Sequence, residues 1–211
     1  MPTNDMKRIA LFIFLLCSAL ASSAQVTFRV SYQGAKPTIS DFVTSFTSAR
    51  VQTQEEYDEY DESFNALRDV WERHRQGKPL EEEETLIVDE RNGYVCYQRG
   101  PFDGWLSRYE LCFWNESDGR HKVFAYCMSS FLNDRYEPGQ YDGITFYRYD
   151  ATTRQMTMAE DMGFPLRYCN DEGNWMSYAL PRTGKDITVT TWYKTGPRKT
   201  LLKWNGRKFA Y

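Results

Sequence analysis

The side chains best suited to acid–base, nucleophilic or metal chemistry are scarce in this sequence. It contains two histidines, His74 and His121. His74 lies at the end of a predicted helix, where the helix dipole favours a cation, so a structural role explains it. Any Ser-His-Asp or Cys-His nucleophile would have to use His121, which follows Ser117 and Asp118 in a predicted tight turn. Two histidines exclude a histidine-rich metal site.

The cysteines do not have the spacing of a zinc or redox motif, because no two of them form a C-x-x-C pair. If Asp118-Gly119 is a two-residue turn, Cys112 faces Ala125 and lies diagonal to Cys127. Diagonal neighbours are about 7–8 Å apart, which is too far for a disulfide. We expect at least two buried thiols among the four cysteines that follow residue 24. These four are Cys96, Cys112, Cys127 and Cys169.

The common catalytic signatures are also missing. The sequence has no G-x-S-x-G, P-loop, G-x-G-x-x-G or H-E-x-x-H string, which are the signatures of many hydrolases, nucleotide-binding proteins and zinc peptidases. The oxygen-rich loops do not reproduce the spacing of a calcium loop. With 29 Asp and Glu residues, spacing alone selects no carboxylate pair for sugar hydrolysis. We therefore predict no catalytic residue, no metal ligand and no cofactor.

Aromatic residues are the distinctive feature of the composition and make up 16% of the chain. Such rings can form flat platforms for sugars or wedges for proteins. On the predicted strand 143–150, Tyr147 and Tyr149 fall on one face and Ile144 and Phe146 on the other, so both faces carry apolar surface. Either a second layer or a partner must cover the outer face. The predicted binding residues are Trp105, Trp114, Trp192, Tyr147 and Tyr149.

Two helices are expected before residue 84. The spacing of Ile39, Phe42, Val43 and Phe46 predicts an amphipathic helix over 38–48. For the second helix, Thr53 with Glu56 three residues later is typical of an N-terminal capping box. This helix should end in a cationic turn at 73–75, with a left-handed glycine and then a proline after it. Its apolar stripe is formed by Tyr57, Tyr60, Phe64, Leu67, Val70 and Trp71.

The remainder indicates strands and turns, because Asx-Gly dipeptides separate short aromatic and β-branched runs. The dipeptides begin at residues 92, 103, 118, 142 and 205. Strands are expected at about 85–91, 94–99, 106–115, 120–131, 143–150, 154–159, 186–194, 199–204 and 207–210. The segment 160–185 should be loop with at most one strand. These elements predict one α+β domain over 25–211, with the helical part (38–77) packed on a curved antiparallel meander or partial barrel of about eight strands (85–211).

The N-terminus has the pattern of a signal peptide. Lys7 and Arg8 precede an apolar run, and small residues lead to Ala24, after which we expect cleavage. The apolar run is shorter than the roughly 20 residues that span a bilayer. These features predict a periplasmic or secreted protein with no transmembrane segment after cleavage. A lipid anchor at Cys17 is the minority alternative, because Leu16 occupies the position where a small residue is preferred. A net charge of −3 gives no support to nucleic-acid binding.

The β half contains the segments 112–115 (Cys-Phe-Trp-Asn), 118–119 (Asp-Gly), 139–150 and 203–206 (Lys-Trp-Asn-Gly). In these segments it resembles uncharacterised secreted proteins of Bacteroidota. The resemblance implies an exported α+β domain and no particular activity.

The leading hypothesis is a non-enzymatic cell-envelope protein that binds a protein or glycan through the outer aromatic face of its sheet. One alternative is a carboxylate-based extracellular glycan hydrolase, which requires a pocket that holds two facing acids. Another is a structural subunit of an envelope assembly, which predicts co-purifying proteins and no affinity for small ligands.

Overall fold

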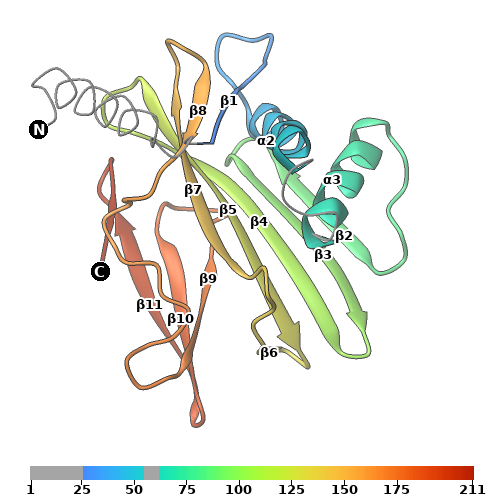
Figure 1. The fold of residues 1–211 in the computed structure, drawn as a ribbon, viewed down its shortest axis with the longest axis vertical. Helices are drawn as coiled ribbons and strands as arrows, with labels where there is room; N and C mark the ends of the chain where they lie inside the picture. Colours follow the sequence, from blue (N-terminus) through green and yellow to red (C-terminus); the bar gives the residue numbers. More distant parts are fainter. Residues whose placement is uncertain (1–25, 55–61) are drawn as a thin grey trace, which may run out of the picture.

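The computed structural model describes residues 26–54 and 62–211, and these residues form three layers (Figure 1). Helices α2 (Ile39–Gln54) and α3 (Glu62–Arg75) cover one face of a large antiparallel sheet. A smaller sheet packs against the opposite face. The predicted α+β class, with two leading helices on a mainly antiparallel sheet, is confirmed.

The large sheet is a meander with strand order β1-β8-β7-β5-β4-β3-β2, and β6 pairs with β5. The bounds are β1 (Thr27–Arg29), β2 (Glu84–Asp89), β3 (Tyr94–Phe102), β4 (Trp105–Asn115), β5 (His121–Leu132), β6 (Arg135–Tyr136), β7 (Gly143–Asp150) and β8 (Gln155–Met158). The predicted register is confirmed, since Cys112 faces Ala125 across the β4–β5 hairpin. The sequence did not reveal the short strands β1 and β6.

Alternation along the central strands produces two separate cores. On β4, Tyr109 and Leu111 point toward the helices, whereas Cys112 and Trp114 point toward the smaller sheet. Strands β3, β5 and β7 divide their side chains in the same way, because successive residues of a strand face opposite sides. The large sheet is therefore buried on both faces.

The last strands leave the meander and form the second sheet, in the order β12-β11-β10-β9. They are β9 (Trp175–Ala179), β10 (Ile187–Tyr193), β11 (Gly196–Trp204) and β12 (Phe209–Ala210). The irregular segment 160–185 contains one strand, β9, as predicted. The segment leads the chain to the face of the large sheet that the helices do not cover. The outer face was expected to be covered either by a second layer or by a partner, and the structure shows a second layer.

The helices differ from expectation at one boundary. Residue 53 lies inside α2, so Thr53 does not begin the second helix. No glycine or proline follows Ser48 in α2, and the helix continues to Gln54. Tyr57 and Tyr60 lie outside the described residues. The end of α3 is as predicted, with Gly77 at a φ of 67° just beyond it. Neither helix is long and apolar enough to cross a membrane.

Candidate functional site

Three of the five predicted binding residues are buried, and the predicted outer aromatic face is therefore wrong for them. Tyr147 and Tyr149 lie in the core beneath the helices. Trp114 lies between the two sheets, where its indole Nε1 donates a hydrogen bond to the carbonyl of Lys185 at 2.8 Å. The physical reason is that each face of the large sheet has its own covering layer. None of these three rings offers a face to a partner.

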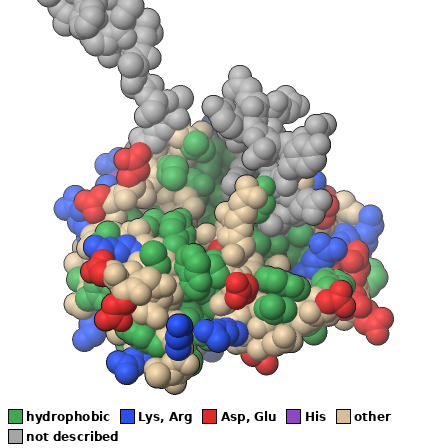
Figure 2. Space-filling model, turned by 60° about the horizontal axis from the view of Figure 1, so that its bottom comes forward, with side chains coloured by type: hydrophobic (Ala, Val, Ile, Leu, Met, Phe, Trp, Pro, Cys, Tyr) green, Lys and Arg blue, Asp and Glu red, His purple; other side chains and the backbone are tan. Residues whose placement is uncertain are grey.

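The other two predicted residues reach the surface at separate places. The side chain of Trp105 is 44% exposed at the start of β4. Trp114 lies near the other end of this 11-residue strand and on its opposite face, roughly 30 Å away. Trp192 of β10 is half-buried, stacks on Tyr136 and donates a hydrogen bond to Ser177 at 2.8 Å. Figure 2 shows apolar side chains reaching one face of the molecule among acidic and basic ones.

All four cysteines of the described part are free thiols. Cys96, Cys112 and Cys127 are buried between the two sheets, and Cys169 is exposed. The expectation of at least two buried thiols is confirmed. Burial raises the pKa of Cys112 and Cys127 well above the ordinary value, so their thiolates are disfavoured.

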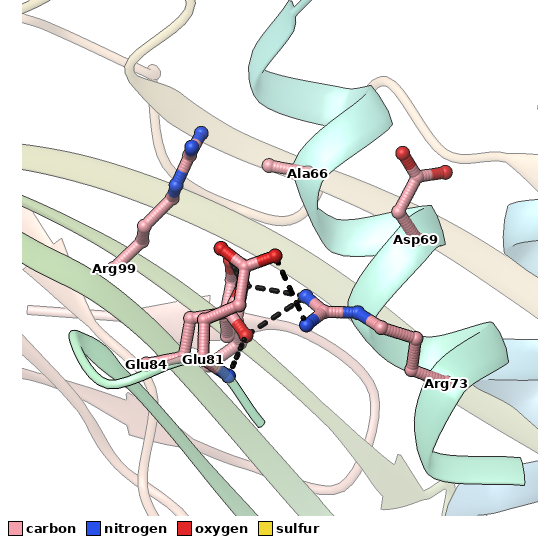
Figure 3. A pocket seen from close by; sticks show the side chains of 7 residues that line it. Ala66, Asp69, Arg73, Glu81, Glu84 and Arg99 are labelled. Carbon is pink, nitrogen blue, oxygen red and sulfur yellow. Dashed lines mark hydrogen bonds and ion pairs between the residues drawn. The ribbon is translucent and has the colours of Figure 1, made fainter. Parts of the chain in front are cut away.

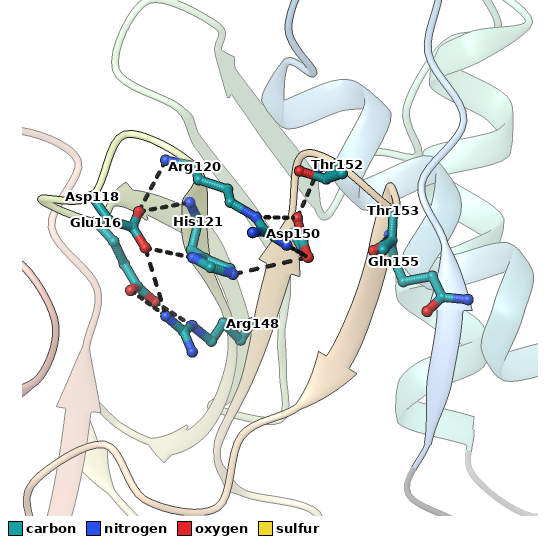
Figure 4. Close-up of polar contacts among 9 residues, drawn as sticks. All are labelled: Glu116, Asp118, Arg120, His121, Arg148, Asp150, Thr152, Thr153 and Gln155. Carbon is teal, nitrogen blue, oxygen red and sulfur yellow. Dashed lines mark hydrogen bonds and ion pairs between the residues drawn. The ribbon is translucent and has the colours of Figure 1, made fainter.

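His121 belongs to an ion-pair network at the β4–β5 turn and the end of β7 (Figure 4). Its Nδ1 lies 2.5 Å from an oxygen of Asp118, and its Nε2 lies 4.0 Å from Asp150. The imidazole therefore has a carboxylate on each side. A Ser-His-Asp triad needs a hydroxyl at the second ring nitrogen. This geometry favours a structural role for His121 at the turn.

Glu116, Asp118 and His121 bring three possible metal-ligand atoms within 4.8 Å of one another. Both oxygens of Glu116, however, accept hydrogen bonds of 2.7 Å from the guanidinium of Arg148. Asp118 accepts bonds from the backbone N–H groups of His121 and Arg120, and these bonds with the His121 ring hold the pKa of Asp118 well below its ordinary value. Arginine already supplies the positive charge here, so the donor set fits an ion-pair network better than a metal site.

A second polar group lines a pocket of about 300 Å³ between α3 and the strands β2 and β3 (Figure 3). Its centre is Glu84, whose side chain is 3% exposed. Arg73 donates two hydrogen bonds to this carboxylate at 2.7 and 2.8 Å, and the hydroxyl of Tyr97 donates a third at 2.7 Å. The backbone N–H of Glu81 donates a fourth at 2.9 Å. Glu84 is thus fully engaged in joining α3 to the sheet.

Glu110 is a buried carboxyl group between the two sheets. It accepts a hydrogen bond of 2.6 Å from the hydroxyl of Tyr94 and one of 3.4 Å from the backbone N–H of Leu180. Burial raises the pKa of Glu110, and these bonds together with the positive charge of Arg108 oppose the shift only in part. Burial likewise raises the pKa of Asp142. Neither carboxyl lines any of the pockets described in this section.

Replacing Glu110 by glutamine should therefore change the pH dependence of stability. A folded-state pKa above the unfolded value contributes stability below the unfolded pKa of about 4.3, and this contribution is lost as the pH rises. Because glutamine does not ionise, the variant does not lose this stability as the pH rises. Urea unfolding should show that the unfolding free energy of the variant increases relative to that of the wild type between about pH 4.5 and about pH 7.5. A difference in unfolding free energy that is the same at both pH values would contradict the assignment.

The largest of the described pockets is a groove of about 810 Å³ along α2, α3 and the segment 31–33. Its lining residues are Ser31, Tyr32, Gln33, Ser40, Asp41, Thr44, Trp71, His74 and Arg75. A neighbouring pocket of about 350 Å³ shares Trp71 and Arg75 with it, so the hollow continues along the helix pair. The groove combines aromatic rings with hydroxyl, amide, carboxylate, imidazole and guanidinium groups.

The groove side chains are held in place from several elements. The indole Nε1 of Trp71 donates to the hydroxyl of Thr44 at 3.0 Å, which links α3 to α2. The imidazole of His74 lies beside the Trp71 ring, with the ring centroids 5.4 Å apart. Tyr32 accepts a hydrogen bond from the hydroxyl of Tyr149 at 3.2 Å, and the guanidinium of Arg154 lies over its ring. The groove is therefore preorganised.

Sequence reasoning missed this groove. It placed Trp71 in the apolar stripe of a helix and His74 at the end of that helix, and both statements are correct. Tyr32 comes from a segment for which no element was expected. Nothing in the spacing of these residues indicates that they share one hollow, because their proximity depends on the packing of α2 against α3.

Comparison with known proteins adds no assignment. No family model matches the chain, and no curated protein or solved structure matches it significantly.

Proposed function

We propose that this protein is an exported, non-enzymatic binding module that holds a short glycan segment in the groove between α2, α3 and residues 31–33. One observation carries the proposal: aromatic rings and hydrogen-bonding side chains of several kinds line a single groove of about 810 Å³. Ligand pockets commonly measure roughly 300–1,000 Å³. The volume suits a few sugar rings.

The chemistry of the lining fits a polyhydroxylated ligand. A sugar presents apolar C–H faces that pack on aromatic rings, and hydroxyl groups that both donate and accept hydrogen bonds. Here Tyr32 and His74 supply rings, while Gln33 and Arg75 supply planar donors. Because hydrogen bonds fix Tyr32 and Trp71 before any ligand arrives, little side-chain entropy is lost on binding.

The same groove supports binding better than sugar hydrolysis. Glycosidases commonly need two carboxyl groups on either side of the scissile bond. Asp69 and Glu72 line the neighbouring pocket but not the groove itself, and Asp41 is the single carboxylate among the groove residues. One of its oxygens accepts hydrogen bonds from the backbone N–H and the hydroxyl of Thr38, at 2.8 and 3.0 Å. Asp41 therefore caps α2.

The export part of the proposal rests on the N-terminal pattern, which is typical of a signal peptide that directs a protein to the periplasm or the exterior. In these compartments polysaccharides and glycoproteins are accessible. The proposal makes an envelope or extracellular glycan the partner, and a protein surface becomes an outcome of the test.

The test begins with the wild-type chain on an array of neutral and acidic oligosaccharides, followed by calorimetry with the tightest binder. His74→Ala and Gln33→Ala alter exposed groove side chains and should each weaken binding by about tenfold or more. Trp105→Ala changes an exposed ring outside the groove and serves as the matched control, with affinity unchanged. The proposal fails if no oligosaccharide binds, or if Trp105→Ala abolishes binding while both groove variants retain it.

A further inference from the structure

Arg108 of β4 is a charged side chain for which the described part of the chain provides no carboxylate partner. It points toward the smaller sheet and is half-buried. Its Nε is buried and makes no hydrogen bond, the single side-chain atom of this kind among residues 26–54 and 62–211. A buried donor without a partner costs roughly 1–3 kcal/mol, so an arrangement that supplies an acceptor would be favoured.

The acid on the same face of β4 makes no ion pair with Arg108. Glu110 lies two positions further along β4 on the same face, but its oxygens accept hydrogen bonds from Tyr94 and Leu180 instead. No carboxylate in residues 26–54 and 62–211 lies within the 4.0 Å ion-pair distance of the guanidinium, although nine contacts between a guanidinium and a carboxylate exist elsewhere in that part. Arg108 therefore makes no ion pair at contact distance, and its charge acts on Glu110 only from further away, where it lowers the pKa of that carboxyl against the effect of burial.

An aromatic group holds this guanidinium in one orientation. The guanidinium carbon of Arg108 lies 5.0 Å from the centroid of the Phe131 ring. Phe131 in turn makes edge contacts with Tyr136 of β6 and Trp192 of β10. An arginine stacked on a ring loses less rotational freedom when its N–H fork binds a planar acceptor. Gln98 of β3 is directly opposite Arg108 and adds an amide donor on the same face.

We propose that Arg108, Phe131 and Gln98 form a binding site for a small carboxylate ligand at the seam between the two sheets. A carboxylate matches the planar fork of arginine and accepts two parallel hydrogen bonds. The half-buried ring of Phe131 lies beside the fork and contacts the ring of Trp192, so the ligand class is a carboxylate attached to an apolar or aromatic group. The site is separate from the proposed glycan groove, because no residue is common to the two.

Benzoate is a suitable probe, and benzyl alcohol is its uncharged counterpart. Calorimetry on the full chain should show saturable benzoate binding that is weakened about tenfold or more by Arg108→Gln. Arg198→Gln is the matched control, because this guanidinium also lies over a ring, 4.9 Å from the centroid of Tyr193. The control should bind benzoate like the wild type, and benzyl alcohol should bind at least about tenfold more weakly than benzoate.

Arg108→Lys keeps the charge and removes the fork, so it should also weaken binding, and it replaces Arg108→Gln if that variant does not fold. Any of three results overturns the inference: no saturable binding of benzoate by the wild type, unchanged affinity in both Arg108 variants, or equal affinity for benzyl alcohol. A thermal shift with benzoate that appears in the wild type and Arg198→Gln, but not in the Arg108 variants, provides a second readout that supports the site.

Discussion

Replacing Phe46 by alanine should lower the free energy of unfolding by about 4 kcal/mol. Phe46 of α2 is 1% exposed and contacts the rings of Phe28, Phe64, Phe124, Tyr126 and Tyr147. These rings come from β1, α3, β5 and β7, so one side chain joins both helices to the sheet. Its removal leaves a cavity that the surrounding rings cannot fill.

Phe102→Ala is the matched control for this deletion, because the same atoms are removed from a ring that is 46% exposed. Surface changes of this kind usually stay within about 0.5 kcal/mol. Urea unfolding followed by circular dichroism measures both variants. Equal costs for the two would mean that the helices do not pack on the sheet as described.

Arg73→Ala should destabilise the protein by about 3 kcal/mol, the second largest effect expected. The substitution leaves the Glu84 carboxylate, 3% exposed, without its cation. Burial raises the pKa of Glu84, but the hydrogen bonds from Arg73, Glu81 and Tyr97 outweigh it, and the pKa is lowered overall. A lowered pKa contributes stability above the unfolded value of about 4.3, and that stability is lost as the pH falls through the folded value.

The cost of Arg73→Ala should therefore be largest at neutral pH and should shrink in acid, where Glu84 becomes protonated. Arg68→Ala removes an arginine from the same helix whose ion pair with Asp69 is exposed, and it should cost less than about 1 kcal/mol. Denaturant titrations of both variants at about pH 7 and about pH 3.5 make the comparison. A cost for Arg73→Ala that is no larger than that of Arg68→Ala, or that grows in acid, would contradict the structural role of the Arg73–Glu84 pair.

Much of the fold follows from local sequence signals. The Asx-Gly dipeptides mark the turns, and the register expected from Asp118-Gly119 pairs Cys112 with Ala125. The loop itself is longer than two residues, because the backbone N–H of Glu116 donates a hydrogen bond to the carbonyl of His121. The cations at 73–75 and the left-handed Gly77 mark the end of α3. These signals act over a few residues, which is why sequence alone identifies them.

The candidate site was harder to predict, because burial depends on layers that no local pattern specifies. Alternation shows that Tyr147 and Tyr149 share a face, but it does not show that α2 covers that face. The same holds for Trp114 and the second sheet. Tyr32 and Trp71 belong to distant segments, and packing alone brings them to one groove.

Nuclear magnetic resonance can locate a bound glycan on the protein and so test whether the groove holds it. The backbone amide signals of the isotope-labelled protein would be followed during titration with the oligosaccharide that binds most tightly. Binding in the groove predicts the largest shifts at the lining residues, which are Ser31, Tyr32, Gln33, Ser40, Asp41, Thr44, Trp71, His74 and Arg75. Shifts confined to the surroundings of Trp105 or Trp192, with the groove amides unchanged, would contradict it.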